Sequence, residues 1–193
     1  MFPGGCAAFF LAGLLIGCCA SPAKAEVWPG SAEIEFHATS TLHDFSGTVR
    51  TDPFDCLVLL DGSAATLGGT ATVAVARMDT RHAKRDANMR NMFEAVRFPL
   101  ITGRVKPARI DPAAPPPVPL HLTIRNRTRT IPATLTGWRL ADNRLRFDLD
   151  MTLSLREFGL SPPVILGVIR VGDPVSVRIH VELAQPPDAA AAP

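Results

Sequence analysis

The chain has 193 residues, of which 47% are apolar and 20% charged, so it can bury a sizeable core and is not disordered overall. Twenty Lys and Arg side chains against 18 Asp and Glu give a formal charge of +2. This near balance argues against a dedicated nucleic-acid binder, which normally carries a large basic excess. The length fits one domain of ordinary size.

The first segment is apolar and ends in a cleavage pattern. Residues 9–16 form an uncharged run that is too short to span a bilayer, and the small-x-small sequence Ala23-Lys24-Ala25 follows it. This layout is typical of a secretory signal peptide over residues 1–25. We predict export, with the periplasm as the expected compartment, and cleavage after Ala25.

The cysteines suggest an alternative to that cleavage. Leu15-Ile16-Gly17-Cys18 is similar to the lipobox of bacterial lipoproteins, so a lipid anchor at Cys18 is the second choice and an uncleaved apolar anchor the third. Cleavage after Ala25 would leave Cys56 as the remaining thiol, so that no internal disulfide can form. The apolar run 57–60 beside Cys56 predicts that this thiol is buried and inert.

Strand signals dominate the mature chain, residues 26–185. Apolar and polar side chains alternate with a period of two, which is typical of strands that bury one face. In chain order, the clearest alternating stretches are 34–38, 118–124, 131–135, 145–153 and 175–183. Asp61-Gly62 and Asp142-Asn143 supply turn residues between neighbouring stretches. The pattern predicts about eight to ten strands.

One segment, residues 82–98, lacks the alternation. Met89, Met92, Phe93 and Val96 recur there at helical spacing. This spacing predicts one face of a short helix that crosses between strands and stops before the next proline.

Two Pro-rich segments are predicted to lie outside the regular elements. Six prolines fall between Pro107 and Pro119, and they predict a surface connection because Pro cannot sit inside a central strand. Residues 186–193 contain only Pro, Asp and Ala and are predicted to form a disordered tail. The strand patterns on the two sides of the Pro-rich connection look like halves of one sheet, so we expect a single domain over residues 26–185.

Together these elements predict an all-β fold, an antiparallel barrel of about eight strands with one short helical crossover. A closed sheet of that size can hold one small ligand inside. If the apolar faces all point inward, the interior is lined by Leu, Val, Ile, Phe and Met. Such an interior either packs solid or accepts an apolar guest, and a β-sandwich would show the same alternation.

Four motifs in order resemble the YceI-like family of exported lipocalin-like proteins, over roughly residues 31–184. They are residues 40–47 with His43 and Gly47; residues 78–101 with Thr80, Lys84-Arg85-Asp86 and Phe98-Pro99-Leu100-Ile101; residues 122–132 with Leu122-Thr123-Ile124; and residues 156–175 with Phe158-Gly159 and Gly172-Asp173. There are two departures. Asn126 stands where the family hairpin usually has Gly, and Gly103 stands where the family often has Phe.

The resemblance implies a lipocalin-like barrel with a long apolar channel. The channel would bind an isoprenoid lipid, such as an isoprenoid quinone or a polyprenyl phosphate, with no catalysis and no other cofactor, and a homodimer is possible. The residues that we expect to contact the ligand are Phe36, Phe45, Val73, Val75, Met89, Met92, Phe93, Leu122, Ile124, Phe147, Leu149, Met151 and Phe158. Within this set, the helical residues would form either a lid over the channel or plain helix packing.

Three residues are candidates for contact with the ligand's head group: His43, Arg85 and Asp86. A guanidinium presents a fork of donors that suits a phosphate or quinone oxygen. An acidic residue near a helix N-terminus equally suits a cap or an ion pair, so a structural role for Arg85 and Asp86 is the alternative.

Basic residues gather over 77–90 and 125–129, where they could contact anionic lipid head groups at a membrane surface or simply be solvated. No Tyr or Trp accompanies either cluster, which argues against nucleic acid as a partner.

Two other functions stay open at this point. An enzyme acting on a lipid in the same pocket would need a convergent acid–base set, for which His43, Asp44, Arg85 and Asp86 are the plausible members. A structural or adaptor domain would have a solid core. No metal site is expected, because His43 and Asp44 would point to opposite faces as neighbours in a strand.

Overall fold

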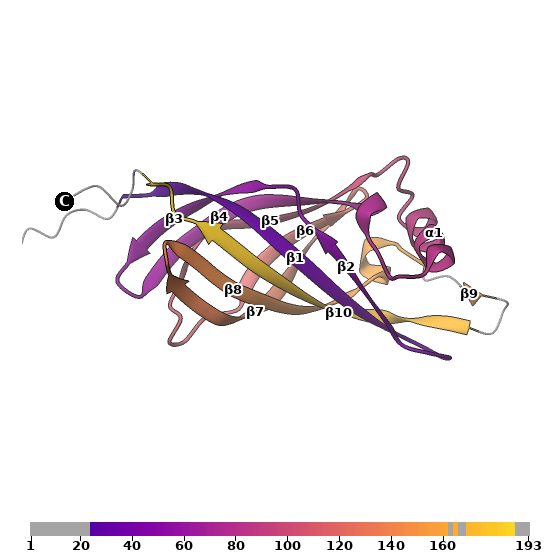
Figure 1. Ribbon diagram of the computed structural model, residues 1–193. Coiled ribbons are helices and arrows are strands. Elements are labelled where there is room, and N and C mark those ends of the chain that lie inside the picture. Colours follow the sequence, from indigo (N-terminus) through magenta and orange to yellow (C-terminus); the bar gives the residue numbers. More distant parts are fainter. Residues whose placement is uncertain (1–23, 162–163, 166–168, 188–193) are drawn as a thin grey trace, which may run out of the picture.

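The computed structural model of the chain describes residues 24–161, 164–165 and 169–187 (Figure 1). The predicted signal peptide with Cys18 lies outside the described residues, except for Lys24 and Ala25. Residues 188–193 of the predicted Ala- and Pro-rich tail lie outside them as well. In the described part, no helix has the length and apolar character that a membrane crossing requires.

The described residues form ten strands, one α-helix and two short 3₁₀ helices. In chain order they are β1 (Glu26–Ser40), β2 (Phe45–Arg50), β3 (Phe54–Asp61), β4 (Ala64–Ala74), η1 (Val75–Arg77), α1 (Ala83–Met92), β5 (Leu100–Ile110), β6 (Val118–Ile124), β7 (Arg127–Ala141), β8 (Arg144–Ser154), η2 (Arg156–Phe158), β9 (Val164–Ile165) and β10 (Ile169–Ala184).

The strands close into an antiparallel barrel, as the sequence predicts. Each strand from β3 to β8 pairs with its neighbour along the chain, and β10 pairs with β8 and with β1. The other edge of β1 pairs with β3 over residues 26–30 and with β2 over residues 33–38, so β2 and β3 share one position in the wall. The result is a closed barrel of eight strand positions, with β9 as an extra strand beside β10.

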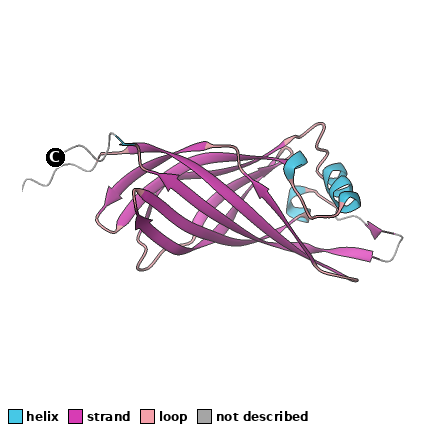
Figure 2. Cartoon of the chain, in the orientation of Figure 1, coloured by secondary structure: helices cyan, strands magenta, loops and turns pink. Residues whose placement is uncertain are grey.

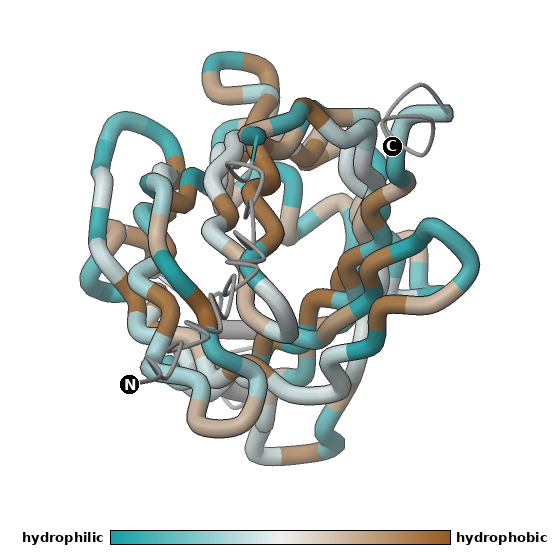
Figure 3. Tube along the Cα trace, turned by 90° about the vertical axis from the view of Figure 1, so that its left-hand side faces the viewer, coloured by the Kyte–Doolittle hydropathy of each residue, from teal (hydrophilic) through white to brown (hydrophobic). Residues whose placement is uncertain are grey.

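Alternating burial explains why these segments are strands. In β8, Leu145, Phe147, Leu149, Met151 and Leu153 are buried while the intervening residues are exposed or half-buried. Seen along the barrel (Figure 3), hydrophobic and hydrophilic residues follow one another along the strands that ring its axis. Each strand thus turns one face inward, as expected for a closed sheet in water.

The predicted turn residues lie at the tight turns. Gly62 connects β3 and β4 with a φ of 62°, and Asp142 and Asn143 connect β7 and β8 with φ of 52° and 57°. Left-handed conformations of this kind favour Gly, Asn and Asp. In the turn between β6 and β7 the positive φ falls on Arg125, at 57°, and not on the neighbouring Asn126, which stands where the family hairpin usually has Gly.

The Pro-rich connection is shorter than predicted. It spans 111–117, because Pro107 lies in β5 and Pro119 in β6. The register of β4 against β5 shifts between Leu67 and Gly69, so Pro107 occupies an irregularity where a bulged strand tolerates the missing N–H. Gly68 makes room for it, since a Cβ at residue 68 would lie 2.9 Å from the backbone nitrogen of Pro107.

The helix forms where predicted but ends earlier. α1 begins after His82, whose Nδ1 accepts a hydrogen bond of 3.3 Å from the backbone N–H of Arg85, and it ends at Met92. Glu94 then adopts a left-handed conformation with a φ of 52°, which stops the helix. Val96 was expected on the apolar face of this helix, and that expectation was wrong, because Val96 lies in the following loop and is fully exposed.

The two ends of the barrel differ. The helical elements α1, η1 and η2 gather at one end (Figure 2), which we call the helical end. The opposite end, which we call the closed end, is packed around Trp28, Leu145 and Leu183, whose side chains are completely buried. The hollow part of the barrel therefore lies toward the helical end.

Candidate functional site

An apolar cavity of about 550 Å³ occupies the helical half of the barrel. Its wall is formed by the inward faces of β1, β2, β4, β5, β6, β8 and β10, and α1 covers it. Small-molecule sites in proteins typically measure about 300–1,000 Å³. The interior is thus hollow in this half, which the alternation in the sequence left undecided.

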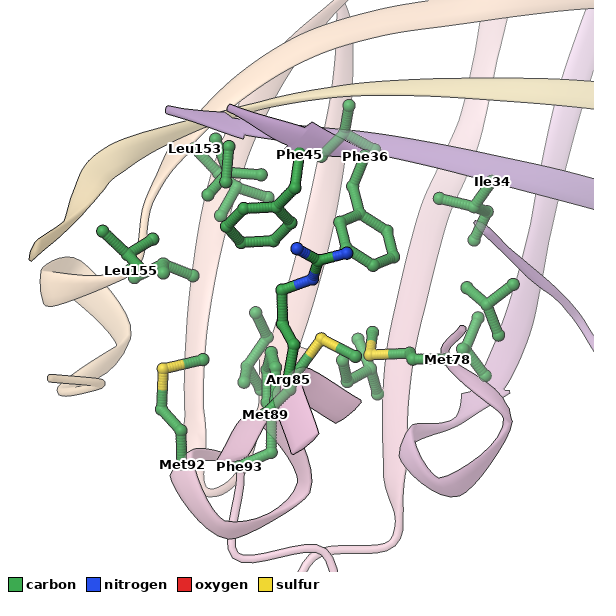
Figure 4. A pocket seen from close by; sticks show the side chains of 18 of the residues that line it. Ile34, Phe36, Phe45, Met78, Arg85, Met89, Met92, Phe93, Leu153 and Leu155 are labelled. Carbon is green, nitrogen blue, oxygen red and sulfur yellow. The ribbon is translucent and has the colours of Figure 1, made fainter. Parts of the chain in front are cut away.

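Most residues that we expected to contact a ligand lie on this wall. They are Phe36, Phe45, Val73, Met89, Met92, Phe93, Leu122, Ile124 and Met151. Figure 4 shows the rings of Phe36 and Phe45 on one side of the cavity and the side chains of α1, including Met89, pointing toward them. The helix therefore covers the cavity in the manner of the expected lid.

Four of the expected residues are buried away from the cavity: Val75, Phe147, Leu149 and Phe158. Val75 begins η1, where the chain leaves the barrel wall, and Phe158 ends η2, which packs against β7. Phe147 and Leu149 have the inward parity, but Phe147 lies one layer closer to the closed end, and Leu149 pairs with Ile179 at the inner end of the cavity without lining it. Alternation identifies the inward face of a strand but not how far along it the interior is hollow.

The wall also includes inward residues that the sequence analysis did not single out: Ile34, Ala38, Ile101, Leu120, Leu153, Leu155, Val175, Val177 and Ile179. Most of them belong to the alternating stretches and share the parity of the expected residues, so the same signal could have found them. Met78, which follows η1, also lies on the wall, and no periodic pattern marks it.

Strand pairing shows where the cavity ends. Ile34 pairs with Ile179, and both line the cavity. One inward position closer to the closed end, Ala32 pairs with Val181 and Val181 pairs with Phe147, and none of these three lines the cavity. We call this layer of Ala32, Val181 and Phe147 the floor. The cavity is therefore blind, with its inner end on apolar side chains.

The opposite end of the cavity is polar and lies at the helical end. Ser40, His43, His82, Lys84 and Asn88 are part of its lining there, and we call this region the mouth. His43, a head-group candidate, is exposed at the mouth. A molecule with a long apolar part and one polar end fits this division.

Arg85 is the one candidate whose charge is directed into the cavity (Figure 4). Its guanidinium lies over the ring of Phe45, 4.5 Å from the centroid. Thr80 fixes it in place, because Nε donates to Thr80 Oγ1 at 2.8 Å and Nη2 donates to the Thr80 carbonyl at 2.7 Å. Among the described residues, none accepts a hydrogen bond from Nη1 or forms an ion pair with Arg85. This nitrogen is therefore available to an oxygen of a ligand.

Asp86 has a structural position and does not line the cavity. Its Oδ1 accepts hydrogen bonds from the Thr80 backbone N–H at 3.0 Å and from the Thr80 hydroxyl at 2.6 Å. Partial burial alone would raise the pKa of Asp86, but these hydrogen bonds and the nearby Arg90 and Arg85 outweigh it and lower the pKa. Since Thr80 in turn holds Arg85, Asp86 positions the guanidinium through Thr80.

Replacing Asp86 by Asn is expected to lower the free energy of unfolding by about 2 kcal/mol at neutral pH, because hydrogen bonds to charged groups contribute about 1.5–3 kcal/mol. The folded pKa of Asp86 lies below its unfolded value of about 4, so this stability is present above that value and is lost as the pH falls through the folded pKa. Urea unfolding of both proteins across the acidic range checks the prediction. A difference in stability that stays constant down to the lowest pH would contradict it.

The structure does not gather the acid–base set that an enzyme would need. Asp44 accepts a hydrogen bond of 3.0 Å from the Ser40 backbone N–H and lies 3.9 Å from Nε2 of His37, while Asp86 is bound to Thr80. His43 and Arg85 line the cavity without either carboxylate. Within the described ranges, no three His, Cys, Asp or Glu residues are grouped so that they could hold a metal ion.

Cys56 is buried in β3, as its apolar neighbours predict. Burial raises the pKa of its thiol, and a backbone hydrogen bond from Gly68 offsets only part of this effect. The thiol therefore stays protonated at neutral pH, which is the state of an inert side chain.

A family model described as the YceI-like domain matches residues 25–183. Three solved structures are similar to the chain. A polyisoprenoid binding domain from Saccharophagus degradans, implicated in plant cell wall breakdown, aligns with a TM-score of 0.60 and 16% identity over 84% of this chain and 100% of that domain. BcnA from Burkholderia cenocepacia aligns with a TM-score of 0.59 and 19% identity over 78% and 95% of the two chains.

The third structure, the YceI protein of Campylobacter jejuni, aligns with a TM-score of 0.53 and 17% identity over 69% and 81% of the two chains. At these identities the likeness shows a shared fold. No curated protein matches the chain significantly.

Proposed function

The chain belongs to the YceI-like family, and from that membership and the shape of its cavity we propose that it is an exported protein that binds an isoprenoid lipid without catalysis. The observation that carries the proposal is the blind apolar cavity with a polar mouth at the helical end. An isoprenoid lipid has the matching division, a long hydrocarbon chain with one polar end.

The apolar wall supports binding of the chain. Each buried methylene group contributes about 0.8 kcal/mol, so several prenyl units would together provide substantial affinity. Methionines 78, 89, 92 and 151 are part of the lining, and their unbranched side chains adapt to the shape of a flexible guest. The similar domain from Saccharophagus degradans is described as polyisoprenoid binding, which favours a prenyl chain over other hydrocarbons.

Arg85 supports binding of the polar end. Arg85 lines the cavity and its Nη1 has no partner among the described residues, and a guanidinium donates well to a quinone carbonyl or a phosphate oxygen. A ligand that enters chain first would place its head group beside Arg85 and its tail against the floor. The sequestered chain would then be protected from the water of the periplasm.

An enzyme in the same cavity is the second candidate, and the contacts of Asp44 and Asp86 speak against it. Asp44 accepts a hydrogen bond from the Ser40 backbone N–H and Asp86 from the backbone N–H and hydroxyl of Thr80, and neither carboxylate lines the cavity with His43. A catalytic role would require one of them to leave these partners.

Binding measurements with a defined panel test the proposal. The panel contains a short-chain prenyl quinone, a prenyl phosphate, a prenyl hydrocarbon and a saturated fatty acid, each titrated into the mature protein. We expect all three prenyl compounds to bind and the fatty acid to bind more weakly. No binding of any prenyl compound to folded protein would refute the function.

Within the same panel, Arg85→Met is expected to lower the affinity for the prenyl quinone and the prenyl phosphate about ten- to a hundredfold, since a hydrogen bond to a charged group contributes about 1.5–3 kcal/mol. Affinity for the hydrocarbon should stay unchanged. Arg90→Met is the matched control, because Arg90 lies on the same helix but not on the cavity wall. Equal losses for all three prenyl compounds would show that Arg85 does not contact the head group.

A further inference from the structure

The two most exposed large apolar side chains among the described residues lie at the helical end of the barrel. Leu42, in the connection between β1 and β2, is 60% exposed, and Val96, in the loop after α1, is fully exposed. Figure 1 shows both segments at the same end of the molecule, on either side of α1. Single exposed apolar side chains are common on protein surfaces, so what lies around these two decides whether they indicate a partner.

The loop that carries Val96 is held firmly to the barrel. The N–H groups of Arg97 and Phe98 both donate to the Glu94 carbonyl at 2.9 Å, and the Glu94 carboxylate pairs with Arg125 from the turn between β6 and β7. Val96 is therefore presented on an ordered loop, so its exposure is a feature of the fold.

Basic residues gather in the segment of the helical end that contains α1 and Val96. Residues 77–97 contain six Lys and Arg against three Asp and Glu, although the whole chain carries only +2. Arg81, Lys84 and Arg97 are exposed, and none of the three forms an ion pair with another described residue. The cationic excess of the molecule is therefore concentrated at the end where the cavity opens.

We propose that the helical end docks on an anionic phospholipid surface, with Leu42 and Val96 entering the interface and Arg81, Lys84 and Arg97 lying among the head groups. Charge complementarity identifies the partner, because each Lys or Arg near such a surface contributes favourably and the apolar tips gain by leaving water. The docking extends the proposed function but does not depend on which lipid the cavity holds.

The position of Leu42 connects this surface to the cavity. Its side chain is exposed and also forms part of the cavity lining. An apolar path thus leads from the outer surface at Leu42 past Phe45 to the interior. A docked barrel would present the mouth to the membrane, so a lipid could pass between bilayer and cavity without crossing water.

Co-sedimentation with vesicles tests the docking. The mature protein is mixed with vesicles of phosphatidylcholine alone or of phosphatidylcholine with phosphatidylglycerol, at low and at high salt. We expect binding to the anionic vesicles that weakens at high salt, since salt screens exposed charges. Each of Arg81→Gln, Lys84→Gln and Arg97→Gln should lower the partition coefficient about fivefold, and each of Leu42→Ser and Val96→Ser about tenfold.

Matched controls lie elsewhere on the barrel. Leu140→Ser removes an apolar side chain that is 45% exposed near the closed end, and Arg104→Gln with Lys106→Gln removes exposed charges from β5. These variants should bind vesicles like the unchanged protein. The proposal would be overturned if the five docking-surface variants and the control variants changed vesicle binding equally. Equal binding to both vesicle types would overturn it too.

Sedimentation without vesicles completes the test. If the protein self-associates and the five docking-surface variants abolish this association, the surface binds a second copy of the chain. That result would also overturn docking on a membrane. Lipid-binding titrations of Arg81→Gln, Val96→Ser and Arg97→Gln keep the two proposals apart, because none of these three residues lines the cavity. Loss of vesicle binding with normal ligand affinity in these variants concerns only the docking surface.

Discussion

Gly103→Phe is expected to abolish lipid binding while the barrel stays folded. Gly103 lies on the cavity wall in β5, and a Cβ built there meets only Leu120 Cδ1, at 3.5 Å, which is ordinary van der Waals contact. A Phe ring can therefore extend into the hollow interior and occupy the space of the ligand. Loss of room for even three methylene groups costs about 2.4 kcal/mol, or about fiftyfold in Kd.

Stability should move in the opposite direction to binding. Filling a cavity with an apolar side chain commonly adds about 0.5–2 kcal/mol to the free energy of unfolding. Thr102→Phe is the matched control, because Thr102 is the adjacent residue of β5 and its side chain points to the outer face. Calorimetric titration with a prenyl quinone and urea unfolding check both effects. Unchanged affinity in Gly103→Phe would show that the ligand does not occupy this cavity.

Phe147→Ala is expected to lower the free energy of unfolding by about 3–5 kcal/mol, as removal of a buried Phe side chain typically does. Phe147 is buried in the floor and stacks on Trp138 with ring centroids 5.8 Å apart. The same change should open the floor toward the packed end of the barrel. We therefore expect the variant to accept longer prenyl chains than the unchanged protein does.

A series of prenyl alcohols of increasing length measures this effect. In the unchanged protein the affinity should rise with each prenyl unit and then level off when the chain reaches the floor, and in Phe147→Ala the plateau should move to longer chains. Phe158→Ala is the control, since Phe158 is buried at the helical end but does not line the cavity. Phe158→Ala should lose a similar amount of stability, and its affinity should level off at the same chain length as in the unchanged protein. If the affinity levels off at the same chain length in all three proteins, the floor is not at Phe147.

Much of the fold follows from the sequence because local rules determine it. The alternation over 145–153 marks β8 with its inward face, and the positive φ of Asp142 and Asn143 is the conformation that these residue types favour. Pro107 was misjudged because a bulge opposite Gly68 accommodates it in β5. Bulges depend on the partner strand, which one segment of sequence does not reveal.

The extent of the cavity was harder to predict than its wall. Phe147 and Met151 have the same parity and similar burial, yet only Met151 lines the cavity. The difference arises because the side chains that meet at each level of the barrel come from several strands, and their combined volume decides whether a level is filled. Gly103 was noted as a departure from the family pattern, and the structure shows that it leaves open space in the wall.

The helical end shows how a single backbone conformation changes a prediction. Helical spacing grouped Val96 with Met89 and Phe93, but the left-handed turn at Glu94 separates them. Met89 lies on the cavity wall, whereas Val96 faces solvent. The hydrogen bonds that join Asp86, Thr80 and Arg85 likewise connect the segment between η1 and α1 to the helix, and the sequence was compatible with both a structural and a binding role for Arg85 and Asp86.

Extraction of the bound lipid tests the central claim most directly. The full chain, expressed with its own first segment in a bacterium that makes isoprenoid quinones, is purified, extracted with organic solvent and analysed by mass spectrometry. We expect a compound with a prenyl chain in near-equimolar amount from the unchanged protein and from Thr102→Phe, and none from Gly103→Phe. Folded, unchanged protein that yields only acyl lipids, or no lipid even after incubation with a prenyl quinone, would contradict the account.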